Sequence, residues 1–61
     1  MQVGDVVCFK SDIEQCGTIV KIKTDLMGRK VLVLENENGF GGDYLRYATR
    51  TEELASDCWV E

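Results

Sequence analysis

Short runs rich in β-branched residues recur about every ten residues along this chain, and glycine-containing polar segments separate them. The clearest runs lie at residues 2–10 (QVGDVVCFK), 17–24 (GTIVKIKT) and 30–36 (KVLVLEN). Valine, isoleucine and phenylalanine favour strands because their bulk packs well on a pleated surface. Four or five short strands at this spacing predict an all-β fold, either a small barrel or a sandwich.

The length of 61 residues is enough for one domain, which we expect to span residues 1–61. A hydrophobic fraction of 44% and a charged fraction of 30% are typical of a folded globular protein rather than a disordered one. The longest unbroken apolar run, at residues 31–34, is far too short to cross a membrane. The first ten residues lack the basic and apolar regions of a signal peptide.

The three cysteines, Cys8, Cys16 and Cys58, form no Cys-x-x-Cys pair. Their odd number is unusual for a secreted disulfide framework. We therefore expect the protein in a reducing cytoplasm, with three free thiols.

Between the strands, residues 11–17 (SDIEQCG) are expected to form a loop that ends at Gly17. Lys21 and Lys23 alternate with apolar residues, which indicates that this strand has one solvent-facing side. The run at residues 31–34 is entirely apolar and predicts a strand that is either buried on both faces or bent between two sheets. The pair Asn38-Gly39 is the strongest turn signal of the chain and suits a type I′ turn.

In the last third of the chain, residues 43–49 (DYLRYAT) are predicted as a fourth strand and residues 58–61 (CWVE) as the last strand. Residues 49–58 are the one helical candidate, about two turns long, because Thr49 or Thr51 suits the N-cap and acidic residues follow. Pairing of the last strand near the first would remove edge strands. The sequence thus predicts a five-stranded barrel with one short helix or helical turn before its last strand.

Three segments, VGDVVCFK, CGTIVKIK and VLVLENENG, give residues 3–39 a recognisable order of strand, loop, strand and turn. In this order they resemble the SH3-like barrels of the KOW, Tudor and related families. The resemblance implies a small SH3-like β-barrel, a fold that binds RNA, peptides, methylated side chains or other subunits. Size, composition and strand-rich layout also resemble the small accessory proteins of tailed bacteriophages, which implies a host or virion protein as partner.

The residue types needed for catalysis are scarce. The chain has no histidine to serve as a base beside a cysteine, and it has no Gly-x-Ser-x-Gly motif. The glycine-rich run at residues 39–42 (GFGG) lacks the lysine spacing of a phosphate-binding loop. A metal site would require Cys8, Cys16 and Cys58 to converge with a carboxylate. We expect instead that these cysteines are small buried side chains, and we expect no enzyme activity, no metal and no cofactor.

The most suggestive binding residues are Phe40, Tyr44, Arg46 and Arg50, because aromatic residues and arginine are enriched at interaction hot spots. They predict a non-enzymatic module that binds a protein partner by aromatic anchoring and charge-assisted hydrogen bonds. Two questions stay open at this point: whether Phe40 folds onto the core or stands out, and whether the arginines merely pair with nearby carboxylates. Trp59 is expected to fill the core.

An alternative is a barrel that contacts RNA or DNA, with basic residues near the second and third strands as phosphate contacts: Lys21, Lys23, Arg29 and Lys30. The net charge of −4, from 7 basic and 11 acidic residues, speaks against broad binding of a phosphate backbone. A third alternative is a structural subunit that assembles with its own copies.

Overall fold

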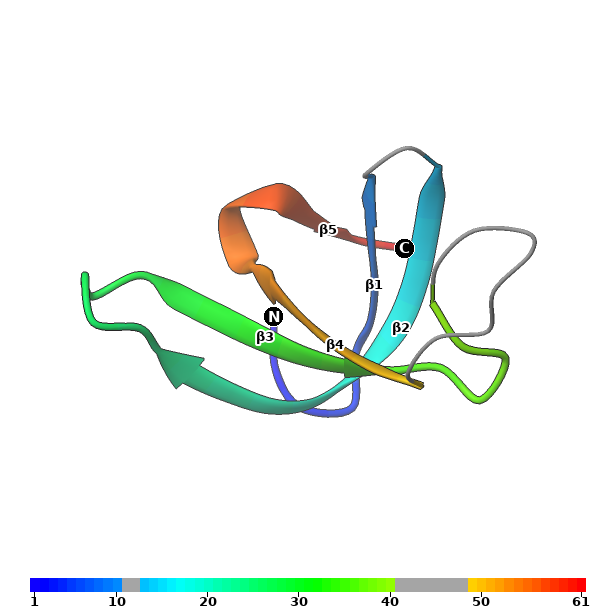
Figure 1. Cartoon of the computed structure of the whole chain (residues 1–61), viewed down its shortest axis with the longest axis horizontal. Coiled ribbons are helices and arrows are strands. Elements are labelled where there is room, and N and C mark those ends of the chain that lie inside the picture. The colour runs from blue at the N-terminus through cyan, green and yellow to red at the C-terminus, as the bar shows by residue number, and fades with distance from the viewer. Residues whose placement is uncertain (11–12, 41–48) are drawn as a thin grey trace.

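Five antiparallel strands form a single sheet in the computed structural model, which describes residues 1–10, 13–40 and 49–61 (Figure 1). The strands are β1 (Val6–Lys10), β2 (Glu14–Thr24), β3 (Lys30–Glu35), β4 (Arg50–Leu54) and β5 (Cys58–Val60). Their order across the sheet is β4-β3-β2-β1-β5, and a 3-10 turn, η1 (Ala55–Asp57), joins β4 to β5. The prediction of an all-β fold with five strands and a helical turn before the last strand is confirmed.

One face of the curved sheet carries the core. Its buried members come from three strands and from the segment after β3: Val7, Phe9, Ile19, Leu32, Leu34 and Phe40. The ring centroids of Phe9 and Phe40 lie 5.8 Å apart. All four apolar residues of β3 are buried, so the prediction of a strand covered on both faces is confirmed.

Phe40 lies over β2 at Gly17, where no side chain stands in its way. A Cβ atom built on Gly17 would come within 2.8 Å of Phe40 Cζ and 3.0 Å of the backbone oxygen of Glu35. Both distances are shorter than an ordinary van der Waals contact. Gly17 therefore lies inside β2 at the point where the ring of Phe40 packs against the strand. The predicted loop over residues 11–17 is wrong from Glu14 onward, since β2 begins there.

A β-bulge interrupts the pairing of β2 with β3. The register passes from Ile19 opposite Leu34 to Lys21 opposite Val33, so Val20 has no partner of its own. An extra residue of this kind bends the strand and changes which side chains face the core. Ile19 and Ile22 both pack into or against the core although three positions separate them, and Val20 faces the opposite side of the sheet.

The expected two-turn helix over residues 49–58 is wrong: this segment is strand β4 followed by the single turn η1. Without β4, the strand β3 would have β2 on one side only, and the backbone groups of its other edge would lack hydrogen-bonding partners. Pairing supplies them, with Thr51 opposite Leu34 and Glu52 opposite Val33. Tertiary pairing therefore outweighs the local helix signal of the Thr-Glu-Glu run.

β5 pairs antiparallel with β1, as predicted, but the sheet does not close into a barrel by hydrogen bonding. β4 and β5 remain its two edges, and η1 carries the chain from one to the other (Figure 1). The expectation that edge strands disappear is therefore wrong for the described residues. The predicted fourth strand over residues 43–49 lies, except for Thr49, outside them.

Trp59 is 43% exposed, so its predicted place in the core is wrong. Successive side chains of a strand point to opposite faces. Cys58 packs against the core, and Trp59 consequently lies on the outer face, where its register partner is Cys8. In the next pair across the same face, Cys8 is opposite Cys16 and the two are joined by a disulfide, with Cα atoms 4.0 Å apart. The prediction of three free thiols is wrong; Cys58 is the free cysteine.

The β2–β3 hairpin projects along the longest axis of the molecule and ends in a tight turn (Figure 1). The Asp25 carboxylate organises this turn by accepting hydrogen bonds from the backbone N–H groups of Met27 and Arg29 and from Arg29 Nε. Leu26 and Met27 at the tip are fully or largely exposed. Within the described residues, no helix has the length and hydrophobicity that crossing a membrane requires.

Candidate functional site: a groove on the outer face of the sheet

One row of side chains runs across the outer face of four strands, because direct partners in antiparallel pairs project from the same face. Val6 of β1 is opposite Thr18 of β2, Thr18 is opposite Glu35 of β3, and Glu35 is opposite Arg50 of β4. At the other end of the row, the backbone N–H of Glu61 donates to the carbonyl of Val6. The strand register and this hydrogen bond therefore bring five residues from distant parts of the sequence into one line.

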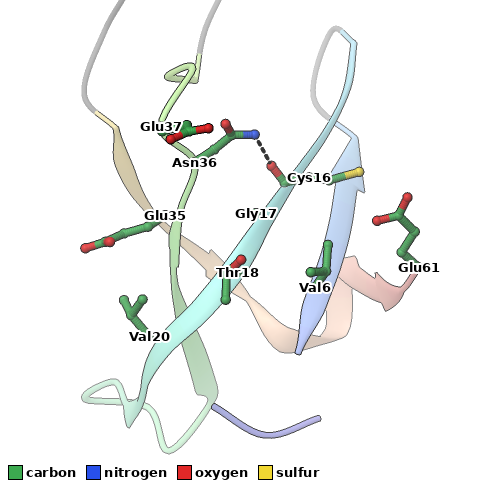
Figure 2. Close-up of a pocket in the computed structure, with 9 residues that line it drawn as sticks. All are labelled: Val6, Cys16, Gly17, Thr18, Val20, Glu35, Asn36, Glu37 and Glu61. Atoms are coloured by element: carbon green, nitrogen blue, oxygen red, sulfur yellow. Dashed lines mark hydrogen bonds between the residues drawn. The ribbon is translucent and has the colours of Figure 1, made fainter. Parts of the chain in front are cut away.

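A groove of about 580 Å³ lies along this row (Figure 2). Val6, Thr18 and Val20 give it an apolar to weakly polar floor, and the chain after β3 forms one wall. The complete lining is Val6, Cys16, Gly17, Thr18, Val20, Glu35, Asn36, Glu37 and Glu61. The volume falls within the range of known ligand sites, but the shape is an open trough along a sheet face rather than a closed pocket.

Asn36 fixes the wall of the groove. Its side-chain Nδ2 donates to the carbonyl oxygen of Cys16 at 2.9 Å, the dashed line in Figure 2, and its Oδ1 accepts from the backbone N–H of Asn38. The backbone N–H of Gly39 donates to the Asn36 carbonyl, and Gly39 has a φ of 84°. The predicted turn at this place is confirmed, but Asn38 does not have the positive φ that a type I′ turn requires. The wall is thus held by side-chain and backbone bonds.

Negative charge lies on two sides of the floor. Figure 2 shows Glu37 near the Asn36 end and Glu61 beside Val6. Among the described residues, neither carboxylate has an ion-pair partner. The third acid, Glu35, is turned away from Thr18 and accepts hydrogen bonds from Nε, at 2.8 Å, and Nη2 of Arg50. The groove therefore offers two unpaired carboxylates around a floor of two valines and a threonine.

The predicted partner-binding residues do not gather on one surface in the described part of the chain. Phe40 is 8% exposed and belongs to the core, which removes its ring from any outer surface. Arg50 is exposed and pairs with Glu35 at the edge of the groove. Tyr44 and Arg46 lie outside the described residues. Binding of a partner by Tyr44 and Arg46 stays a prediction. Arg50 is the member of the predicted set that lies next to the groove, through its ion pair with Glu35.

The predicted nucleic-acid contacts follow the β2–β3 hairpin, and all four side chains are exposed. Two of them are neutralised locally: Lys23 Nζ lies 2.9 Å from Glu52, and Arg29 Nε lies 2.8 Å from Asp25. Among the described residues, Lys21 and Lys30 have no ion pair. The register places Lys21 opposite Val33 and Lys30 on the other face of β3, so the two unpaired lysines do not form one patch. A protein that makes six to ten phosphate contacts needs far more positive charge on one surface.

Sequence reasoning did not single out Val6, Thr18, Glu37 and Glu61 as neighbours. One signal was present: Val6 and Glu61 belong to the two strands that were expected to pair. The bulge at Val20 and the register of β2 with β3 carry no comparable signal in the sequence. Comparisons with protein-family models, with curated proteins and with solved structures find no match to this chain.

Proposed function

We propose that this protein is a cytoplasmic, non-enzymatic interaction module that binds an extended segment of a partner protein in the outer-face groove. The observation that carries the proposal is the pairing of an apolar floor, Val6 and Val20, with unpaired carboxylates on two sides, Glu37 and Glu61. An apolar side chain in the trough removes the valines from water. Flanking lysines or arginines then meet the carboxylates, so the fitting segment is apolar in its centre and basic at its ends.

The SH3-like resemblance supports this proposal in part. The resemblance implies a small barrel, and the chain has five antiparallel strands with a turn before the last one, in a sheet that hydrogen bonds do not close. A host or virion protein is the partner class that fits the second resemblance, to small phage proteins. Arg50 and the predicted neighbours Tyr44 and Arg46 would extend the contact surface beyond the Glu35 side of the groove.

The test uses a fluorescein-labelled peptide with a central Leu-Val-Leu flanked by two lysines on each side. Fluorescence anisotropy should show saturable binding to the wild-type protein and none for the peptide with glutamates in place of the lysines. Glu37→Lys or Glu61→Lys should each weaken binding about five- to tenfold, a change of roughly 1 kcal/mol. Asp57→Lys is the matched control, since it alters net charge equally from η1, outside the groove.

If Asp57→Lys weakens binding as much as the two groove variants, the attraction is general and the groove is not the site. Absence of saturable binding by the basic peptide would refute the proposed segment chemistry. The nucleic-acid alternative predicts a different pattern: binding of a labelled oligonucleotide that falls steeply with salt and is lost in Lys21→Glu and Lys30→Glu. The self-assembly alternative requires a mass that rises with protein concentration in sedimentation equilibrium.

A further inference from the structure

The disulfide on the outer face has an acidic neighbour of the kind that completes a metal site. Cys8 of β1 and Cys16 of β2 are direct register partners, and Glu14 lies two residues before Cys16 on the same face of β2. The Sγ atoms of the two cysteines and a carboxylate oxygen of Glu14 all lie within 4.8 Å of one another. Cys8 is buried, Cys16 is half-buried and Glu14 is exposed, so the cluster reaches the surface at Glu14.

We propose that the reduced protein binds a thiophilic divalent cation, with Zn²⁺ as the natural occupant, through Cys8, Cys16 and Glu14. Thiolate ligands select such metals over the hard cations that oxygen ligands favour. Three protein ligands and one water molecule complete a tetrahedral zinc shell. The site is independent of the peptide groove, although Cys16 touches both.

The geometry of the strands suits this coordination. Zn–S distances of about 2.3 Å in a tetrahedron place two sulfur atoms roughly 3.8 Å apart. Cross-strand partners project side by side, so rotation about the Cα–Cβ bonds separates the sulfurs to that span without moving the backbone. Glu14 reaches the same point because i and i+2 side chains of a strand share a face.

The chemistry requires a two-electron reductant, for which a small thiol suffices. Two molecules of a small thiol reduce the disulfide to two cysteine thiols and leave as one oxidised disulfide. Binding of the metal ion then releases the two thiol protons to solvent, since the ligating form is the thiolate. Oxidation and metal binding thus compete for the same two sulfur atoms.

Cys58 is the built-in control. It is the third cysteine of the chain, but it packs against the core on the other face, away from the cluster. The sequence raised the idea of a site made of all three cysteines with a carboxylate. The fold brings together two of them with Glu14 and separates the third.

The test uses Co²⁺ as a spectroscopic probe for the zinc site, with the full chain reduced by a phosphine under anaerobic conditions. We expect one Co²⁺ to bind per chain, with near-ultraviolet thiolate-to-cobalt bands and visible bands of tetrahedral cobalt, and Zn²⁺ to displace it. Cys16→Ser should abolish the thiolate bands, Cys58→Ser should leave them unchanged, and Glu14→Gln should weaken affinity by about tenfold or more. The oxidised wild type should show no bands.

Cys16 is half-buried, so Cys16→Ser is the variant best able to retain the fold, and circular dichroism of each variant checks this. Trp59 provides a second measurement, because it is the only tryptophan and the register partner of Cys8. Bound Co²⁺ should quench its emission in wild type and Cys58→Ser alike. Absence of thiolate bands in the reduced wild type, their survival in Cys16→Ser, or their loss in folded Cys58→Ser would each overturn the proposal.

Discussion

Replacing Gly17 by alanine tests the packing of Phe40 against β2, because the sign of the change in the free energy of unfolding shows whether the ring lies over Gly17. Gly17 does not have a positive φ, so an alanine fits its backbone conformation. At such a position, alanine in place of glycine stabilises a protein by about 0.4–1 kcal/mol through the unfolded state. Without a steric conflict, Gly17→Ala should therefore raise stability.

The structure predicts the opposite sign. The new Cβ would stand 2.8 Å from Phe40 Cζ, 3.0 Å from the Glu35 carbonyl oxygen and 3.2 Å from Leu34 Cβ. Phe40 is a rigid ring inside the core, and the Glu35 oxygen belongs to the backbone, so neither moves easily. Overpacking of this kind costs about 1–3 kcal/mol. After subtraction of the unfolded-state gain, we expect a net loss on the order of 1–2 kcal/mol.

Urea denaturation followed by circular dichroism measures this loss, and an unchanged m-value shows that the transition stays comparable. In a domain of this size, a loss of 1 kcal/mol lowers the melting temperature by roughly 4–8 °C. Gly17→Ala should also cost less in a Phe40→Leu background, where the ring tip is absent, with a coupling energy of about 0.5 kcal/mol or more. Relief is partial, since the Glu35 oxygen remains. An alanine variant as stable as wild type, or more stable, would refute the packing of Phe40 over Gly17.

Three further predictions concern the hairpin tip and the free thiol. Hydrogen bonds from Arg29 and a neighbouring backbone N–H hold the pKa of the Asp25 carboxyl below its usual 3.8. The stabilisation of the fold by this carboxylate should therefore be complete above pH 3.8 and be lost as the pH falls through the lowered pKa. An Asp25 pKa of 3.8 or higher in an NMR titration would contradict this. Burial raises the pKa of the Cys58 thiol, and nearby negative charges add to this effect. Iodoacetamide at pH 8 should therefore modify Cys58 more slowly in the folded protein than in urea, and equal rates would show that the fold does not raise this pKa. Leu26→Ser and Met27→Ser should each change the free energy of unfolding by less than about 0.5 kcal/mol, and a larger loss in denaturation would show that the tip is packed.

The sequence predicted β1, β2 and β3 well, because their β-branched runs are local signals, but β4 lies where a helix was expected. It failed where the deciding contact is distant. The sequence predicts Gly17 as the end of a loop, but the absence of a side chain at Gly17 is what lets the ring of Phe40 pack against β2. The Thr-Glu-Glu run looked like a helix start, but the unpaired edge of β3 recruits it as a strand.

The cysteine prediction failed for a different reason. An odd count argued for free thiols, whereas the register of β1 with β2 places Cys8 directly opposite Cys16. That register depends on where the connecting turn is centred, and the sequence predicts a loop up to residue 17 whereas β2 begins at Glu14. The groove was equally hidden, since it results from register across four strands and from the bulge at Val20. The sequence shows which residues could form a disulfide or line a binding site, but the strand register decides which of them lie in contact.

The pairing of β5 with β1 has a consequence for how this chain folds. β1 and β2 meet across a sequence separation of 8 residues between Cys8 and Cys16, whereas Cys8 and Trp59 are 59 − 8 = 51 residues apart. Loop closure over the longer span costs roughly 1.5 kcal/mol more in chain entropy. The meander β1–β2–β3 can therefore form early and locally, while the free edge of β1 stays unpaired until β5, which the ribosome makes later, is available. Until β5 pairs with it, that edge is a template for pairing with other chains, so β5 also protects the nascent protein from aggregation.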